Sequence, residues 1–195
     1  MKKVFLIFLV LLIAGCTNES VNVKNPNGDS LTYKYFSKKN YNVTKYNLKL
    51  KNDNSIIVIR KKNNNVFYEI TGGMNLIILE KDGLRYNFDL TNKSYSKQSI
   101  IAVQNYTKGI LPEDMLKLKN QSYKTGKEKI NSHKYVFETY KYEEGKTTYY
   151  FDDNKLKFIK KKTAEENLLY EVLNFSVKVK DNAFKIPKGY SEITY

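Results

Sequence analysis

The sequence has little of the chemistry that most enzymes use. It contains one cysteine, one histidine and no tryptophan among 195 residues. A single cysteine excludes a disulfide within the chain, and a single histidine excludes a site built from several histidines or from a Cys/His pair. The sequence also has no glycine-rich phosphate loop and no G-x-S-x-G motif. We therefore expect a protein that is not an enzyme and that holds no metal or cofactor.

The remaining titratable side chains do little to suggest catalysis. His133 follows a predicted turn at Asn131-Ser132, and we interpret it as an exposed turn residue. Adjacent acidic residues occur at Glu143-Glu144, Asp152-Asp153 and Glu165-Glu166. Two carboxyl groups can serve as acid and base, but neighbours on a strand point to opposite faces and neighbours on a turn both face water. We interpret these pairs as solubilising turns.

Only one long apolar run is present, and it lies at the N-terminus. Lys2 and Lys3 precede eleven uncharged residues from Val4 to Ala14, which end on Gly15 and Cys16. This order is typical of a secretion signal. Eleven residues are too few for a bilayer core that needs about 20 in helical form. We expect residues 1–15 to be a signal peptide that is cleaved between Gly15 and Cys16.

Ile13-Ala14-Gly15-Cys16 resembles the lipobox of bacterial lipoproteins. The resemblance implies a diacylglyceryl group on the Cys16 thiol, and it explains why an exported chain carries a lone cysteine. Two acyl chains give durable attachment where one gives only reversible binding. We expect an extracytoplasmic protein that its lipid anchors to a membrane.

Positive charge is abundant but arginine is scarce. The chain has 34 Lys and Arg against 20 Asp and Glu, and only Arg60 and Arg85 are arginines. Such a surface favours anionic partners, including acidic lipids, wall polymers or an acidic protein face. Specific reading of nucleic acid relies on bidentate arginine, so we expect no nucleic-acid partner. An AT-rich coding sequence, which enriches Lys and Asn, is the alternative explanation of the charge.

Residues 16–28 combine the lipidated Cys16 with a polar segment that contains Pro26 and Gly28, and we interpret this segment as a flexible tether. As a coil it would reach roughly 20 Å. Residues 29–195 then form one domain. Asp29 or Ser30 is expected to cap a short helix that places Leu31, Tyr35 and Phe36 on one face.

Alternating apolar and polar residues predict strands along most of the domain. Tyr46, Leu48 and Leu50 alternate with lysine and asparagine, which indicates one buried face and one wet face. Short Asn, Asp and Gly clusters separate the segments and tolerate the positive φ of hairpin turns. Further strands are predicted at Ser55–Lys61, Val66–Thr71, Asn75–Glu80, Arg85–Leu90, Lys93–Gln98, Tyr123–Ile130, Lys134–Tyr142, Thr147–Phe151, Lys155–Thr163 and Leu168–Val179.

Between the two groups of strands, apolar residues from Ile100 to Leu118 fall at roughly helical spacing. Pro112 disfavours helix at the residue before it. We predict two short helices, the second starting near Pro112 with Glu113 and Asp114 in its first turn. The whole pattern predicts a mainly β (α+β) fold. Ten or so antiparallel strands interrupted by short helices imply a large curved sheet, with the helices covering one side.

Two stretches carry a family resemblance. The first contains Lys81–Tyr86, Asp89-Leu90 and Lys93–Tyr95, and the second contains Lys146–Asp152, Leu156–Ile159 and Asp181–Tyr190. Together they resemble the LolA/LolB-type lipoprotein-carrier fold, which implies an unclosed antiparallel β-barrel of about ten to eleven strands with short helices covering one side. Within that fold, a Lys-rich and Tyr-rich chain with a lipobox is most similar to the GerS-type spore germination lipoproteins. This resemblance implies that the lipid anchors the protein to a cell or spore membrane.

The resemblance implies a non-catalytic protein that binds and activates a cortex N-acetylmuramoyl-L-alanine amidase of the CwlD type, a zinc enzyme needed for germination. No catalytic residue carries over. An open sheet edge would suit this partner or a strand-swapped homodimer. The alternative is a carrier that holds an acyl chain or lipoprotein in an open apolar barrel. A third hypothesis, a wall-polymer or nucleic-acid binding module, rests on charge and aromatic residues alone.

Overall fold

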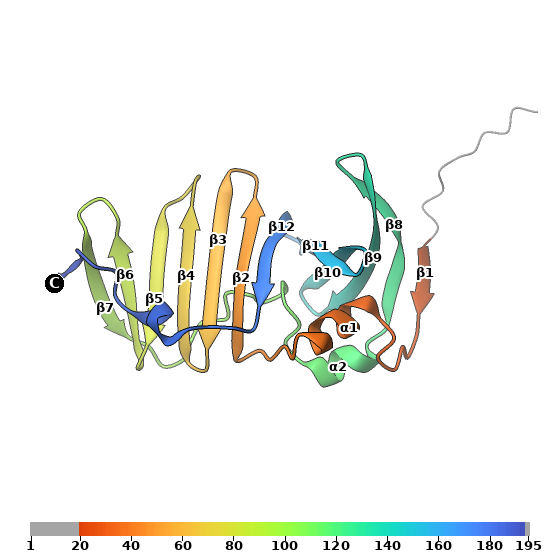
Figure 1. Ribbon diagram of the computed structural model, residues 1–195, viewed down its shortest axis with the longest axis horizontal. Helices are drawn as coiled ribbons and strands as arrows, with labels where there is room; N and C mark the ends of the chain where they lie inside the picture. The colour runs from red at the N-terminus through yellow and green to blue at the C-terminus, as the bar shows by residue number, and fades with distance from the viewer. Residues whose placement is uncertain (1–19, 194–195) are drawn as a thin grey trace, which may run out of the picture.

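The computed structural model describes residues 20–193 (Figure 1). The two α-helices of this part are α1 (Leu31–Lys38) and α2 (Met115–Asn120), and a single 3-10 turn, η1, spans Asp181–Phe184. The strands are β1 (Ser20–Val23), β2 (Lys45–Asn52), β3 (Ser55–Lys62), β4 (Asn65–Thr71), β5 (Leu76–Lys81), β6 (Leu84–Asp89), β7 (Ser94–Ser99), β8 (Tyr123–Ile130), β9 (His133–Tyr142), β10 (Gly145–Asp152), β11 (Lys155–Lys162), β12 (Asn167–Ser176) and β13 (Ser191–Glu192).

The predicted turns join successive strands into hairpins. Their residues adopt positive φ, with values of 48° at Asp53, 55° at Asn63, 54° at Asp82, 49° at Asn131 and 46° at Asp153. Asn and Asp tolerate this left-handed conformation better than other non-glycine residues, since their short polar side chains bond to the local backbone. The turn chemistry therefore sets where each predicted strand ends.

The strands form one open sheet in the order β1-β8-β9-β10-β11-β12-β2-β3-β4-β5-β6-β7-β13. The two groups of hairpins meet where β12 pairs with β2, with Phe175 opposite Leu48. The sheet does not close on itself, because β1 and β13 lie at opposite ends of the order. This confirms the predicted mainly β, unclosed fold. Strands β1 and β13 raise the strand number to thirteen within the described residues, and β13 runs parallel to β7.

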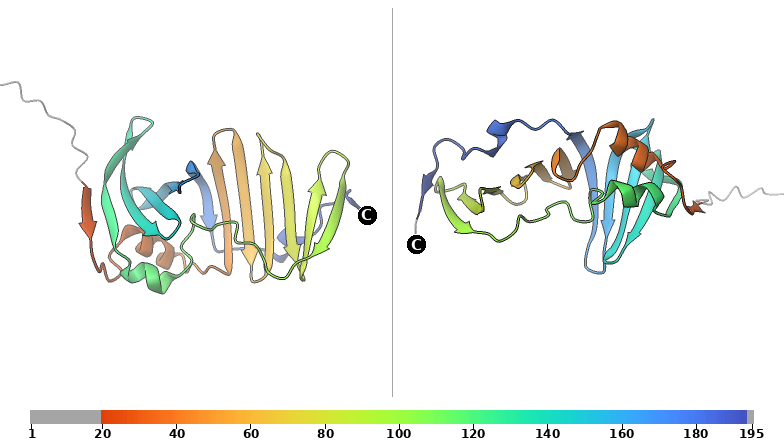
Figure 2. Two further views of the ribbon diagram at one scale, coloured as in Figure 1. Left: turned by 180° about the vertical axis from the view of Figure 1, so that it is seen from behind. Right: turned by 90° about the horizontal axis from the view of Figure 1, so that it is seen from below.

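The sheet turns strongly between its halves. Seen from below (Figure 2, right), strands β8–β11 lie lengthwise while β2–β6 are nearly end-on. The helices α1 and α2 fill the concave side of the half that β1 and β8–β12 form. Ser30 caps α1 by accepting a hydrogen bond from Tyr33 N, and Phe36 packs edge-on against Tyr149 and Phe175 at 6.0 and 5.2 Å between ring centroids.

Two chain segments cover the opposite faces of β2–β7 (Figure 2, right). Residues 100–114 cross the inner face, where Val103, Tyr106, Ile110 and Leu111 join the main core. The C-terminal segment crosses the outer face and buries Phe184 in a second cluster. That cluster also contains Phe67, Ile77, Leu79 and Phe88.

The structure corrects three predictions. The tether prediction is wrong for residues 20–28, because Ser20–Val23 pairs with β8 and Gly28 N donates to Lys119 O at 2.7 Å. Residues 100–111 form an irregular segment in place of the first predicted helix. The second helix starts at Met115, later than predicted, and Asp114 is its N-cap.

The aromatic core makes the fold sensitive to alkali. Burial raises the pKa of Tyr35, Tyr142 and Tyr170 to about 12. An unfolded tyrosine ionises near pH 10, so above this pH the unfolded chain binds fewer protons than the folded one and stability falls.

We expect the fold to keep its full stability up to about pH 9 and to lose it as pH rises from about 10 to 12. Tyrosinate absorbance and circular dichroism recorded along the same titration provide the check. Ionisation of every tyrosine near pH 10, with the secondary structure unchanged, would contradict the burial of these side chains.

Candidate functional site

The sequence-predicted site residues fall into two groups. Gly15 and Cys16, the cleavage and lipidation residues, lie outside the described residues 20–193. His133 begins β9 with an exposed ring, and its Nε2 lies 3.4 Å from Asp152 Oδ1. Glu143-Glu144 and Glu165-Glu166 are exposed, as expected of turn residues. Within residues 20–193 the structure thus brings His133 next to one acidic residue and gathers no larger group of His, Cys, Asp or Glu around it.

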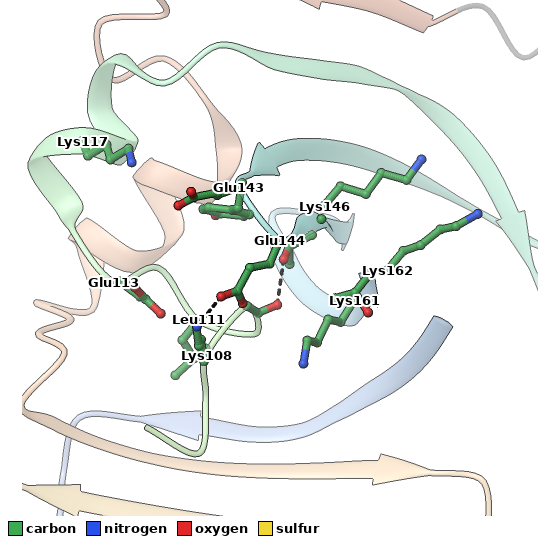
Figure 3. A pocket seen from close by; sticks show the side chains of 14 residues that line it. Lys108, Leu111, Glu113, Lys117, Glu143, Glu144, Lys146, Lys161 and Lys162 are labelled. Atoms are coloured by element: carbon green, nitrogen blue, oxygen red, sulfur yellow. Dashed lines mark hydrogen bonds and ion pairs between the residues drawn. The ribbon is translucent and has the colours of Figure 1, made fainter. Parts of the chain in front are cut away.

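A pocket of about 270 Å³, with several charged residues in its lining, opens beside the β9–β10 turn (Figure 3). Four separate segments build it: the loop at residues 108–113, α2, the β9–β10 turn and the end of β11. Thr147 Oγ1 donates to Gly109 O at 2.7 Å and ties the loop to β10. The lining residues are Lys108, Gly109, Leu111, Glu113, Lys117, Tyr142, Glu143, Glu144, Gly145, Lys146, Thr147, Lys161, Lys162 and Thr163.

Charges of both signs meet at this pocket. Lys108 Nζ lies 2.6 Å from Glu144 Oε1, and this hydrogen bond, with the negative charges of Glu144, Glu113 and Glu143, raises the pKa of Lys108. Both partners of the ion pair are largely exposed, so water screens it and its contribution to stability is small. Lys146 and Lys162 extend away from these carboxylates, side by side (Figure 3). The pocket can hold small polar groups and offers no pre-formed acid and base.

Two buried glutamates, neither singled out from the sequence, fasten other segments of the chain to the sheet. Glu138 on β9 is 2% exposed and receives hydrogen bonds from Leu31 N at 2.7 Å and Thr32 N at 2.9 Å, at the start of α1. Thr32 Oγ1 and Tyr140 Oη add two more, at 2.7 and 3.1 Å. A carboxylate that accepts the free N–H groups of a helix start stabilises the helix.

Glu80 on β5 plays the same part for the irregular segment. It is fully buried and lies 2.6 Å from Arg85 Nη2. Gln104 N donates to it at 2.9 Å and Tyr106 Oη at 3.0 Å. Residues 100–114 are therefore fastened to the sheet through one carboxylate. Alternation along β5 and β9 places both glutamates on inward positions. This alternation is the sequence signal from which their burial could have been predicted.

The ends of the sheet are its other distinctive surfaces. On β7 only Ser94 and Tyr95 pair with β13 among the described residues. Tyr95 O accepts from Ile193 N, so alternate residues Lys97 and Ser99 direct their backbone groups outward. Ile101, two residues beyond β7, is fully exposed. We define the β7 edge as residues 96–101. At the other end, within the described part of the chain, β1 pairs with β8 alone.

Within the part of the chain that the structure describes, no group of three or more His, Cys, Asp or Glu side chains is arranged to hold a metal ion. No helix among residues 20–193 has the length and apolar character needed to span a lipid bilayer.

The comparisons with known proteins leave the family open. No protein-family model matches the sequence. No curated protein matches it either. Among solved structures, an uncharacterized conserved protein from Thermus thermophilus is similar over 84% of this chain and 94% of that chain, with 8% identity and a TM-score of 0.43. A similarity this distant carries no argument about function.

Proposed function

We propose that the protein is a non-catalytic lipoprotein, anchored outside the cytoplasm, that binds and activates an N-acetylmuramoyl-L-alanine amidase of the CwlD type for the cortex modification needed in spore germination. The lipobox at Cys16 and the resemblance to GerS-type lipoproteins support the class and the partner. The observation that carries the binding function is the β7 edge, where among residues 20–193 no strand pairs with the outward side of Lys97 and Ser99, next to an exposed isoleucine.

The β7 edge has what a protein partner needs. Outward N–H and C=O groups at Lys97 and Ser99 can pair with a strand of another chain. Ile101 exposes its whole side chain to water, and burying it against a partner would remove apolar surface at a gain of roughly 2 kcal/mol. The edge lies eleven strand positions from β1, about 50 Å along the sheet. A partner can therefore reach it without meeting the anchored end.

The interior favours the accessory role over the carrier role. A carrier needs an open apolar space for an acyl chain. In the described residues the concave side is filled by aromatic side chains, and Phe36, Tyr46, Tyr140, Tyr149 and Phe151 are each at most 2% exposed. The interior of a densely packed core has no room for a ligand without displacing these rings.

The decisive experiment is co-purification of the chain from residue 17 onward with the amidase, reading the size of the complex, bound zinc and amidase activity. We expect a stable complex whose amidase holds more zinc and turns over faster than the amidase alone. An amidase that is equally active and equally zinc-loaded without this protein would overturn the proposal.

A matched pair of variants tests the surface. Ile101→Asp at the β7 edge should weaken the complex at least tenfold, because a charge replaces the apolar contact. Leu116→Asp on α2 is the control, since Leu116 is 79% exposed on the other half of the molecule. Equal binding by both variants would remove the β7 edge from the interface.

A second copy of the chain is the other partner that an open edge fits. The proposal includes a strand-swapped homodimer, in which an edge strand pairs with the sheet of the neighbouring copy. Light scattering on the purified chain measures this directly. A dimer mass supports the homodimer, and a monomer mass at all concentrations excludes it.

A further inference from the structure

The outer face of β8–β11 carries lysines at positions that face each other across neighbouring strands. Lys146 on β10 lies directly opposite Lys141 on β9 and Lys162 on β11. Lys160 lies in the next outward row, with Lys124 of β8 at the other end of that row. We define the lysine face as these five residues. Tyr123, Tyr140 and Ile159, which adjoin Lys124, Lys141 and Lys160 in the sequence, point to the core, and so does Tyr149, three residues from Lys146. Alternation along the strands therefore directs the lysines outward.

Ion pairs within the described residues do not neutralise the lysine face. None of its five ammonium groups makes an ion pair with another residue between 20 and 193. Figure 3 shows Lys146 and Lys162 extending together, away from the carboxylates of the pocket. Like charges directly opposite each other in a sheet destabilise it. Three such charges in register are best explained by an anionic surface that opposes them.

The position of β1 indicates which anionic surface this is. Asn22 of β1 lies directly opposite Lys124, so the first described strand borders the lysine face. Four residue steps separate Cys16 from Ser20, and such a chain spans at most about 14 Å. From β1 to β11 the sheet adds four strand positions, about 20 Å. A lipid on Cys16 would hold the whole face close to the headgroups.

We propose that the lysine face docks on the anionic headgroups of the membrane that holds the lipid anchor. This inference uses the expected lipidation of Cys16 and goes beyond the amidase function. Lysine ammonium groups contact headgroup phosphates as mobile point charges and lack the bidentate geometry of arginine. The docking therefore depends on surface charge and salt, with little preference among anionic lipids. Docking turns the outer face of β8–β11 to the membrane and leaves the β7 edge free for a protein partner.

The test is vesicle sedimentation with a Cys16→Ser chain that begins at residue 16, so that binding depends on the protein surface alone. This chain contains every contact described above. The probes are phosphatidylcholine vesicles with and without phosphatidylglycerol, at about 0.1 M and about 1 M NaCl, where the Debye length is about 10 Å and about 3 Å. We expect binding to the anionic vesicles at the lower salt only.

The specific variant is Lys141→Ser, Lys146→Ser and Lys162→Ser combined. It should lower the vesicle partition constant about 100-fold at the lower salt and should leave the melting temperature unchanged or raised, because the opposed charges are gone. The control combines Lys180→Ser, Lys185→Ser and Lys188→Ser, which removes the same charge from exposed positions of the C-terminal segment.

Equal loss of binding in the two triple variants would overturn the proposal, since net charge alone would then explain binding. Failure of the parent chain to bind anionic vesicles would also overturn the proposal, even if the chain binds a soluble acidic polymer. The assay contains no amidase, so its failure and the failure of the proposed function are told apart.

Discussion

Glu138→Gln is expected to lower the melting temperature by about 10 °C, which corresponds to a loss of about 3 kcal/mol in a chain of this size. The carboxylate accepts four hydrogen bonds, from Leu31 N, Thr32 N, Thr32 Oγ1 and Tyr140 Oη. An acceptor with two oxygens can satisfy all four. Glutamine keeps the shape but presents an N–H₂ group to donors, so at least one buried N–H loses its partner.

Thermal unfolding of three variants separates the causes. Thr32→Val removes a single hydrogen bond and should cost about 1 kcal/mol. Glu143→Gln changes an exposed carboxylate of the β9–β10 turn and should stay within about 0.5 kcal/mol of the parent. If Glu138→Gln and Glu143→Gln have the same melting temperature, the Glu138 carboxylate does not stabilise the start of α1.

The strands could be predicted from the sequence because two local signals agree. Along β2 the apolar Tyr46, Leu48 and Leu50 alternate with polar residues, and all three are at most 1% exposed in the structure. The hairpin turns carry Asn and Asp at the positions where φ is positive. Both signals act over a few residues, so they identify a strand and its end without knowledge of its neighbours.

What the sequence could not show depends on contacts between distant segments. Ser20–Val23 is short and half polar, and it becomes a strand only because β8, a hundred residues later, pairs with it. The same holds for the contact of β12 with β2, which joins the two halves. The lysine face is another case, because Lys141 and Lys162 come together only once β9, β10 and β11 take their register.

The helix predicted within residues 100–111 is absent for a related reason. Apolar residues at roughly helical spacing predict an amphipathic helix. In the structure Asn105 Oδ1 accepts from Thr107 N at 3.1 Å, and Gly109 adopts a φ of 68°. Both features interrupt a helix. Tyr106 instead stacks on Tyr68 at 4.5 Å between ring centroids, and the segment gains its burial from the sheet.

Glu80→Ala is expected to release this segment and to cost about 3 kcal/mol or more. The substitution leaves Arg85, whose side chain is 24% exposed, without its carboxylate partner, and it leaves Gln104 N and Tyr106 Oη without their acceptor. Breaking a buried pair from one side typically costs about 3–5 kcal/mol, because the other charge stays behind. Hydrogen exchange at residues 103–107 should accelerate well beyond that of the strands, since the segment then opens locally.

The double variant Glu80→Leu with Arg85→Leu separates two effects: the cost of an unpaired Arg85 charge, and the loss of the hydrogen bonds that hold residues 100–114 on the sheet. Removing both charged groups should restore part of the stability lost in Glu80→Ala, because no unpaired ion remains in the sheet. Exchange at residues 103–107 should stay fast, because Gln104 N still lacks an acceptor. Tyr106→Phe is the milder comparison, since it keeps the ring stacked on Tyr68 and loses one hydrogen bond. Slow exchange in the double variant would mean that apolar packing, and not Glu80, holds residues 100–114 on the sheet.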